Sequence, residues 1–303
     1  MNLLKPLNKI GLWPHDIVLY VDGGLCSQMH FYLVGEMLRE RGQRVLYDLR
    51  WFDYCGVDCD GRFARNYDLE RAFPDIRLPR AGNLRCKLMR HTARVFSDYF
   101  DPEADPLDWI ETTGPCYMEG YYRDPEEMYT RLFRERFRLH PEILDPANAI
   151  VLRRIQDAEV SASIHVRRGD LSAYNPAYGE PATVDYFLRA MDAVEREAGG
   201  RKVSYFMFSD EPEWCRRELG ALFQRGDIEV VDLNGSDRGY FDLILMGHCR
   251  HQITSQGSMG KYAAMLRPEE LSDGLVTLLP HKDESAEWVP RFQRVCVIDQ
   301  GLT

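Results

Sequence analysis

The stretch VSASIHVRRGD, residues 160–170, joins a run of small and apolar residues to two arginines, a glycine and an aspartate. The run predicts a buried strand, and the residues after it predict the loop at the carboxyl end of that strand. A pair of arginines there is unexpected, because the chain has a formal net charge of −10. An acidic chain does not attract anions from a distance, so any phosphate recognition by this pair has to be local.

Strands and helices alternate on both sides of this stretch. Downstream, helical periodicity covers 184–197, 214–223, 240–249 and 258–266, and strand patterns cover 203–210, 228–233 and 251–255. Upstream, a strand at 17–24, a helix at 27–41 and a strand at 44–52 form a β-turn-α-β unit. Loops with short helices are predicted over 53–107, and helix with breaks at Pro141 and Pro146 over 124–156.

Such alternation is typical of doubly wound α/β domains. A chain of 303 residues exceeds the usual size of one domain, and its 45% hydrophobic residues are enough for two cores. We therefore predict two Rossmann-like domains, residues 1–155 and 156–303.

Ligands in such domains bind beyond the carboxyl ends of the strands. Four strand-end sequences become informative under this rule: DGGLCSQ (22–28), HVRRGD (165–170), FSDE (208–211) and TSQGS (254–258). All four would face one cleft if the two domains stack with their strand ends opposed. Guanidinium groups bind phosphate oxygens in a bidentate manner, so Arg167 and Arg168 are predicted to clamp a diphosphate without a metal.

Each of these residues also has a plainer structural interpretation. Adjacent arginines are usually solvated or form structural ion pairs. Gly23 and Gly24 fit turn geometry equally well and are not part of a G-x-G-x-x-G fingerprint. His165 could be a hydrogen-bonded core residue, Asp210 a helix N-cap, and Asp242 a cap or structural partner.

Metal, redox and membrane roles receive little support. The eight cysteines are scattered, which predicts reduced thiols in a cytosolic compartment. Cys55 with Cys59, and His248 with His251, are isolated pairs for which structural roles are favoured over a metal. The chain has no run of 18 apolar residues, and its start lacks the core of a signal peptide. We therefore expect a soluble, cytoplasmic protein that has no nucleic-acid partner and needs no cofactor.

The order of six segments is similar to that in the α-1,2-fucosyltransferases of glycosyltransferase family 11, over residues 17–280. These segments are GGLCSQM, YDLRWF, GYYRDPE, SIHVRRGD, FMFSDEPEW and FDLILMGHCRHQI. HVRRGD resembles the H-x-R-R-x-D motif that α-1,6- and protein O-fucosyltransferases share. The resemblance implies a GT-B architecture, GDP-fucose as donor, a glycan or oligosaccharide acceptor, inversion at the anomeric carbon and no metal.

The resemblance also suggests a role for each domain. The N-terminal domain would serve the acceptor and the C-terminal domain would bind the GDP-sugar. Such an enzyme would act in bacterial surface-polysaccharide or O-antigen assembly, in the cytoplasm or at the inner face of the membrane. The oligomeric state stays open.

The residues expected in the site fall into two groups. The catalytic group comprises Arg168, Arg167, Asp170 and His165, and the donor-binding group comprises Gly23, Gly24, Asp210, Ser255, Gln256, Gly257 and Ser258. Fixed donors would stabilise the negative charge that grows on the β-phosphate as the sugar leaves. The base for the acceptor hydroxyl stays open among Asp22, Glu119 and His165.

Two segments depart from the family pattern. Cys26 and Ser27 replace a Gly-Asn pair, and residues 256–262 lack the usual tryptophans. Ser255 and Gln256 look more like the Ser-Gln pair of α-1,6-fucosyltransferases. The predicted reaction is transfer of L-fucose to O-2 of a galactose. The alternatives are another linkage or GDP-sugar, and a GDP-sugar-binding protein without catalytic activity.

Overall fold

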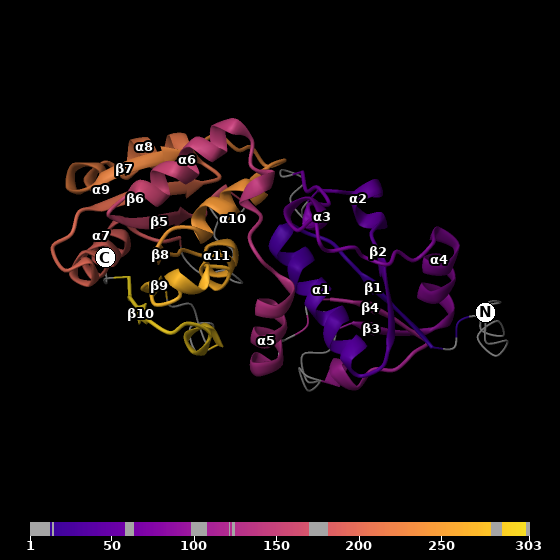
Figure 1. Ribbon diagram of the computed structural model, residues 1–303. Coiled ribbons are helices and arrows are strands. Elements are labelled where there is room, and N and C mark those ends of the chain that lie inside the picture. The colour runs from indigo at the N-terminus through magenta and orange to yellow at the C-terminus, as the bar shows by residue number, and fades with distance from the viewer. Residues whose placement is uncertain are drawn as a thin grey trace. The chain divides into compact units, whose positions relative to one another are not determined.

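The computed structural model of the protein describes residues 13, 15–57, 64–97, 108–120, 122, 125–169, 181–279 and 287–300. The chain forms two compact units, Met1–Arg136 and Phe137–Thr303 (Figure 1). This division lies earlier in the chain than the one expected after residue 155. The reason is that α6 (Pro146–Asp157) packs against α10 (Gly239–Gly247), which belongs to the C-terminal unit.

The N-terminal unit contains a parallel sheet. Its strands are β1 (Asp16–Tyr20), β2 (Arg44–Asp48), β3 (Arg94–Ser97) and β4 (Cys116–Glu119). They are ordered β2-β1-β4-β3, and every pairing is parallel. Its helices are α1 (Leu25–Glu40), α2 (Arg50–Tyr54), α3 (Leu69–Ala72), α4 (Asn83–Thr92) and α5 (Glu126–Arg136). Helices α1 and α4 lie on opposite faces of the sheet (Figure 1).

Two parts of this unit differ from the expectation. The strand predicted over 44–52 ends at Asp48, where the carboxylate accepts the main-chain N–H of Arg50 at 3.1 Å and α2 begins. Strands β3 and β4 were not predicted. They are four residues long, and β3 is largely exposed, so neither carries a clear periodic signal.

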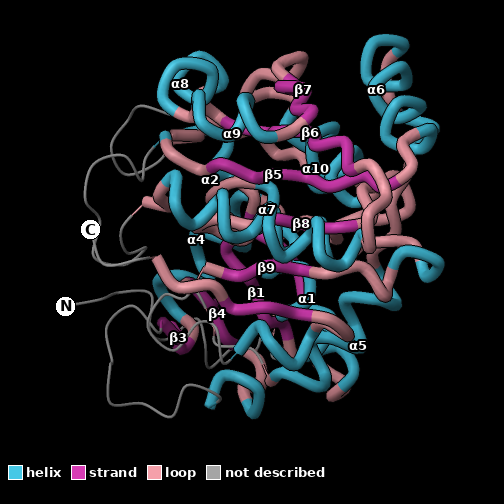
Figure 2. Tube along the Cα trace, turned by 90° about the vertical axis from the view of Figure 1, so that its left-hand side faces the viewer, coloured by secondary structure: helices cyan, strands magenta, loops and turns pink. Residues whose placement is uncertain are grey.

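The C-terminal unit contains a second, larger parallel sheet. Its strands are β5 (Val160–Val166), β6 (Val203–Ser209), β7 (Asp227–Val231), β8 (His251–Ile253), β9 (Val276–Leu278) and β10 (Val295–Val297). They are ordered β10-β9-β8-β5-β6-β7. Figure 2 shows β9, β8, β5, β6 and β7 one above the other in this order, from bottom to top. The chain runs outward from β5 to β7 and then crosses to β8 on the other side of β5. The topological switch point of the sheet therefore lies between β5 and β8.

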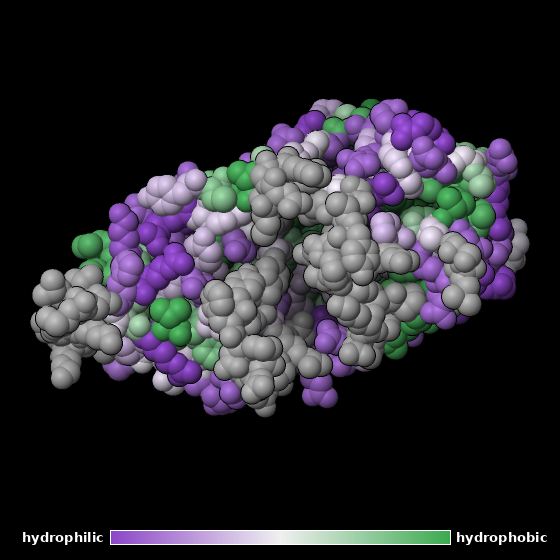
Figure 3. Space-filling view, turned by 180° about the vertical axis from the view of Figure 1, so that it is seen from behind, coloured by the Kyte–Doolittle hydropathy of each residue, from purple (hydrophilic) through white to green (hydrophobic). Residues whose placement is uncertain are grey.

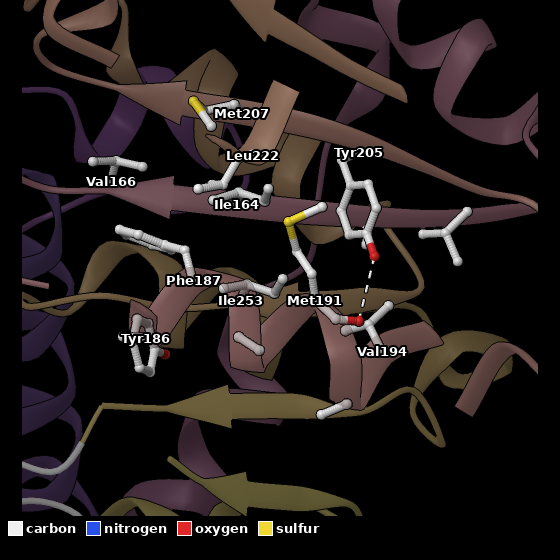
Figure 4. Packing of buried hydrophobic residues seen from close by; sticks show 14 of the residues in the cluster. Ile164, Val166, Tyr186, Phe187, Met191, Val194, Tyr205, Met207, Leu222 and Ile253 are labelled. Atoms are coloured by element: carbon white, nitrogen blue, oxygen red, sulfur yellow. Dashed lines mark hydrogen bonds between the residues drawn. The ribbon is translucent and has the colours of Figure 1, made fainter. Parts of the chain in front are cut away.

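Helices cover both faces of this sheet. Besides α6 and α10 they are α7 (Val184–Ala198), α8 (Pro212–Glu218), α9 (Gly220–Arg225) and α11 (Met259–Met265). On one face of β5, Ile164 and Val166 pack against Phe187 and Met191 of α7 (Figure 4). The other face of β5 carries small or polar residues, and Gly260 of α11 lies against His165 there. All seven residues of β5 are buried.

The α/β class with two parallel sheets is confirmed. A helix expected over 214–223 is two helices, α8 and α9, which meet at Leu219. The face in Figure 3 shows apolar residues scattered among hydrophilic ones. Within the described ranges, none of the helices is both long and apolar enough to span a membrane.

Candidate functional site

Two of the predicted strand-end sequences meet at the switch point. Strand β5 pairs with β8 up to Ile164 and Ile253, so the residues that follow both strands lie side by side. The main-chain N–H of Arg167 donates to Oγ of Ser255 at 2.9 Å, and Ser255 is only 1% exposed. This bond joins the segment HVRRGD to the segment TSQGS.

Asp210, at the carboxyl end of β6, holds both arginines. Its Oδ2 forms an ion pair with the guanidinium of Arg167, and its Oδ1 accepts the main-chain N–H of Arg168 at 2.9 Å. The alternative of a helix cap is not supported, because the N-cap position of α8 is Glu211. Asp210 therefore fixes the path of the chain after β5.

Arg168 is held differently from its neighbour. Its Cζ lies 3.6 Å from the centroid of the Trp214 ring, and its Nε lies 3.5 Å from a carboxylate oxygen of Glu211. The described part of the chain offers no hydrogen-bond acceptor to its two terminal nitrogens. Parallel N–H donors of this kind fit two oxygens of a phosphate or carboxylate.

Gln256 adds a second unused donor. The residue is 5% exposed, and its Oε1 accepts the main-chain N–H of Ala182 at 3.1 Å. Its Nε2 is buried and has no partner among the described residues. A buried amide left in this state costs free energy unless a ligand accepts its hydrogen bond.

Gly257 and Ser258 complete the turn after β8. Gly257 has φ +79°, a backbone conformation that favours glycine, and a Cβ there would make only an ordinary contact with Arg167. The glycine is therefore needed for the turn and not for space. Ser258 precedes α11, and its carbonyl accepts the N–H of Tyr262 at 2.8 Å.

His165 lies beneath this turn as a neutral core residue. It is 6% exposed, and burial, with the charges of Arg167 and Lys261, lowers its pKa to about 3. Its Nδ1 lies 3.4 Å from Oγ of Ser255, and a Cβ at Gly260 would approach its ring to 3.1 Å. His165 thus supports the site, and its low basicity makes it a poor proton acceptor.

The glycine pair after β1 belongs to the N-terminal unit, whereas the donor-binding residues described above belong to the C-terminal unit. Gly23 has φ +74°. Gln28 is fully buried, and its Nε2 donates to the carbonyls of Gly23 and Asn66 at 3.1 and 2.7 Å. Its Oε1 accepts the main-chain N–H of Asp68 at 2.8 Å. Gln28 therefore fixes the shape of the glycine loop, a role that its position in the sequence did not reveal.

The two carboxylates that were considered as bases differ in their surroundings. Glu119, at the end of β4, forms an ion pair with Arg90 at 3.1 Å. Asp22 is half-buried, and burial alone raises its pKa to about 6. A carboxylate with a pKa near 6 is ionised at neutral pH and yet more basic than an ordinary aspartate.

Eight of the predicted residues share one edge of the C-terminal sheet: His165, Arg167, Arg168, Asp210, Ser255, Gln256, Gly257 and Ser258. Asp170 lies outside the described residues. In the described ranges, no group of three or more His, Cys, Asp or Glu side chains is placed to hold a metal. Sequence reasoning gave no role to Trp214 or Glu211, although both lie in the quoted segment FMFSDEPEW.

Known proteins resemble this chain to different extents. The sequence profile of Glycosyl transferase family 11 matches residues 97–284. An alpha-1,2-colitosyltransferase from Escherichia coli is 25% identical over 87% of this chain and 91% of its own length. A galactoside alpha-(1,2)-fucosyltransferase 1 from Saimiri sciureus is 30% identical over 56% of this chain. This match spans only 45% of the Saimiri protein, less than half of its length.

Among solved structures, a NodZ alpha-1,6-fucosyltransferase soaked with GDP-fucose aligns over 84% of this chain and 93% of its own. The TM-score is 0.46 and the sequence identity is 16%.

Proposed function

This chain belongs to glycosyl transferase family 11, and we propose that it moves L-fucose from GDP-fucose to a hydroxyl group of a glycan. The proposed reaction inverts the anomeric carbon and needs no metal. O-2 of a galactose is the favoured acceptor position, because the colitosyltransferase and the fucosyltransferase described above are both named for an α-1,2 linkage.

The observation that carries this proposal is the edge of the Arg168 guanidinium at the switch point of the C-terminal sheet, which has no acceptor among the described residues. Ligands of open parallel sheets bind at this place. Within the part of the chain that the structure describes, the terminal nitrogens of Arg168 and Nε2 of Gln256 are donors without acceptors, and a diphosphate is an acceptor for both. Asp210 occupies Arg167, so Arg168 is the arginine left for the ligand.

The chemistry follows from where charge develops. The bond between C1 of the sugar and the β-phosphate oxygen breaks while the acceptor oxygen bonds to C1 from the opposite face. Negative charge grows on the leaving phosphate, and the terminal nitrogens of Arg168 stabilise it. Donors that are fixed beforehand are effective because they need not reorganise during the reaction.

The proton of the acceptor hydroxyl requires a base, and we assign this role to Asp22. Of the three candidates, His165 has a pKa of about 3 and Glu119 is engaged by Arg90. Asp22 has a raised pKa of about 6 and follows a strand whose loop is fixed by Gln28. The N-terminal unit would then serve the acceptor.

The main alternative to fucose as the sugar of the donor is colitose. Colitose is fucose without its 3-hydroxyl group, and one relative is named for it. A site that hydrogen-bonds a substrate hydroxyl rejects the analogue without it by a large factor, whereas an apolar pocket discriminates weakly. Comparing kcat/KM for GDP-fucose and GDP-colitose therefore decides between the two donors.

Donor binding and turnover test the proposal directly. The full chain is screened by thermal shift against GDP-fucose, GDP-mannose and UDP-glucose, and GDP release is measured with and without EDTA. A ligand at 100 times its Kd raises stability by about 2.7 kcal/mol, so the preferred donor is detectable. We expect GDP-fucose to stabilise most and EDTA to leave turnover intact.

Three outcomes would contradict the proposal. Strongest stabilisation by UDP-glucose would overturn the donor, and loss of activity in EDTA with recovery in Mn²⁺ would overturn the metal-free clamp. Binding of GDP-fucose without any turnover would favour the binding-protein alternative.

Arg168→Ala separates catalysis from folding. It should lower kcat by about 10² or more, because one oxyanion donor is lost. The melting temperature should barely change, since Arg168 is held by one ring and one long contact. Arg189→Ala is the matched control, because Arg189 forms an exposed ion pair with Asp185 on α7.

A further inference from the structure

We propose that Trp214 is a positioning residue, which holds the guanidinium plane of Arg168 so that its two terminal nitrogens stay open to the leaving phosphate. This inference rests on the proposed function, because it concerns how the same site is kept ready. Trp214 would touch neither donor nor acceptor and would act through Arg168.

The guanidinium of Arg168 lies over the ring of Trp214. The Cζ atom of Arg168 lies 3.6 Å from the centroid of the Trp214 ring, close to van der Waals contact. A guanidinium that lies on an aromatic face gives its flat side to the ring and keeps its N–H edge free. The ring thus restricts the side chain without using any of its hydrogen-bond donors.

The other contacts of Arg168 do not set this orientation. Asp210 holds only its main-chain N–H, and Glu211 lies 3.5 Å from Nε, which is long for a charged hydrogen bond. Arg167 shows the alternative outcome, because its guanidinium is paired with Asp210. Without the ring, Arg168 would be free to turn toward the same two carboxylates.

Trp214 is itself held in place by packing against the hydrophobic core. It lies on α8, is half-buried, and packs against the main core cluster of the C-terminal unit. Pro212 begins this helix, and the carbonyl of Glu211 accepts the N–H of Cys215 at 3.2 Å. The turn from β6 into α8 therefore supplies both the carboxylate that fixes the main chain of Arg168 and the ring that fixes its side chain.

The experiment compares Trp214→Leu with Trp214→Phe in the full chain, with hydrolysis of GDP-fucose as the readout. Trp214→Leu should lower kcat by about ten- to a hundredfold, because the donor is displaced from where charge develops. Its KM should change by less than about threefold, since the lost interaction acts mainly in the transition state. Trp214→Phe keeps an aromatic face and should recover most of the activity.

Two controls separate positioning from folding. Phe223→Leu removes another half-buried aromatic ring that packs against the same core cluster but has no stack with Arg168. It should lower the melting temperature about as much as Trp214→Leu and leave kcat unchanged. In an Arg168→Ala background, Trp214→Leu should have almost no further effect on kcat, because the two residues act as one unit.

The experiment distinguishes failure of the proposed function from failure of the proposed role of Trp214. If the parent protein neither binds GDP nor hydrolyses GDP-fucose, the proposed function fails. If the parent turns over and Trp214→Leu keeps its kcat, or if the two mutations act additively, only the role of Trp214 is overturned. Equal losses of kcat in Trp214→Leu and Phe223→Leu would also overturn it, because the effect would then be structural.

Discussion

The main-chain N–H of Arg167 donates to Oγ of Ser255 at 2.9 Å, although the two residues are 88 positions apart in the chain. The bond crosses from the end of β5 to the end of β8, the neighbouring strands at which the strand order reverses. It therefore couples the position of the two arginines to the turn that carries Gln256.

Ser255→Ala should reduce activity more than it reduces the stability of the fold. The change leaves the N–H of Arg167 without its partner and releases the start of the arginine segment. We expect kcat/KM for GDP-fucose hydrolysis to fall about tenfold, which corresponds to one lost buried hydrogen bond. Ser163→Ala is the control, because Ser163 donates to Gln252 within the same pair of strands, away from the arginines. Equal activity in both variants would show that the bond has no role in the site.

Gln256 can be tested with two substitutions, one that removes the amide and one that exchanges only its nitrogen for oxygen. Gln256→Ala should weaken GDP-fucose binding by about 1 to 3 kcal/mol, because a buried donor is removed. Gln256→Glu keeps an oxygen for the N–H of Ala182 but replaces Nε2 by an anionic oxygen, so binding should weaken further. Calorimetric titration of GDP measures both. A glutamate variant that binds GDP like the parent would remove Gln256 from the donor site.

The assignment of Asp22 predicts a pH dependence. A base must be ionised, so kcat/KM for transfer should rise with pH and level off above about pH 6, the raised pKa of this carboxyl. Asp22→Asn should lower kcat/KM for transfer by about 10² or more, and the remaining activity should no longer fall at acid pH. Azide needs no deprotonation, so it should form a fucosyl azide with the variant as readily as with the parent. Glu119→Gln should keep the fall of kcat/KM at acid pH. If this fall disappears in that variant, Glu119 and not Asp22 is the base.

Asp242, on α10, predicts a pH effect on stability. Burial raises its pKa to about 7, although Nδ2 of Asn234 donates to it at 2.7 Å. The folded protein therefore holds a proton that the unfolded chain releases at a lower pH. This contribution is complete below about pH 4 and is lost as pH rises through about 7.

Asp242→Asn should consequently stabilise the protein at pH 8, by about 1 to 3 kcal/mol, and have little effect at pH 4. Urea unfolding at both values measures the difference. Asp185→Asn removes an exposed carboxylate from an ion pair and controls for the change in net charge. A destabilised Asp242→Asn protein at pH 8 would show that the charged form is the one the fold favours.

Local sequence patterns were sufficient to predict the helices and strands that are long and regular. The helix expected over 184–197 is α7, Val184–Ala198, and the buried strand expected at 160–166 is β5. Both are recognisable because side chains repeat with the period of the element, whatever lies around them. The position of polar motifs directly after strands was also readable, and it located most residues of the candidate site at strand ends.

The order of the strands, and the two short strands β9 and β10, could be recognised only in the tertiary structure. Strands β9 and β10 are three residues long, and nothing local distinguishes them from loops. That β8 lies beside β5 follows from pairing across the whole domain, and this pairing creates the switch point.

The sequence by itself determined the α/β class, the two arginines at a strand end and the family resemblance, because these depend on residue types and their spacing. Only the tertiary structure decided which arginine is paired with Asp210, that His165 stays neutral and that Gln28 fixes the glycine loop. Each of these depends on partners or burial that residues distant in the chain provide. Charge, hydrogen bonding and pKa are properties of the folded surroundings, so no local pattern could have specified them.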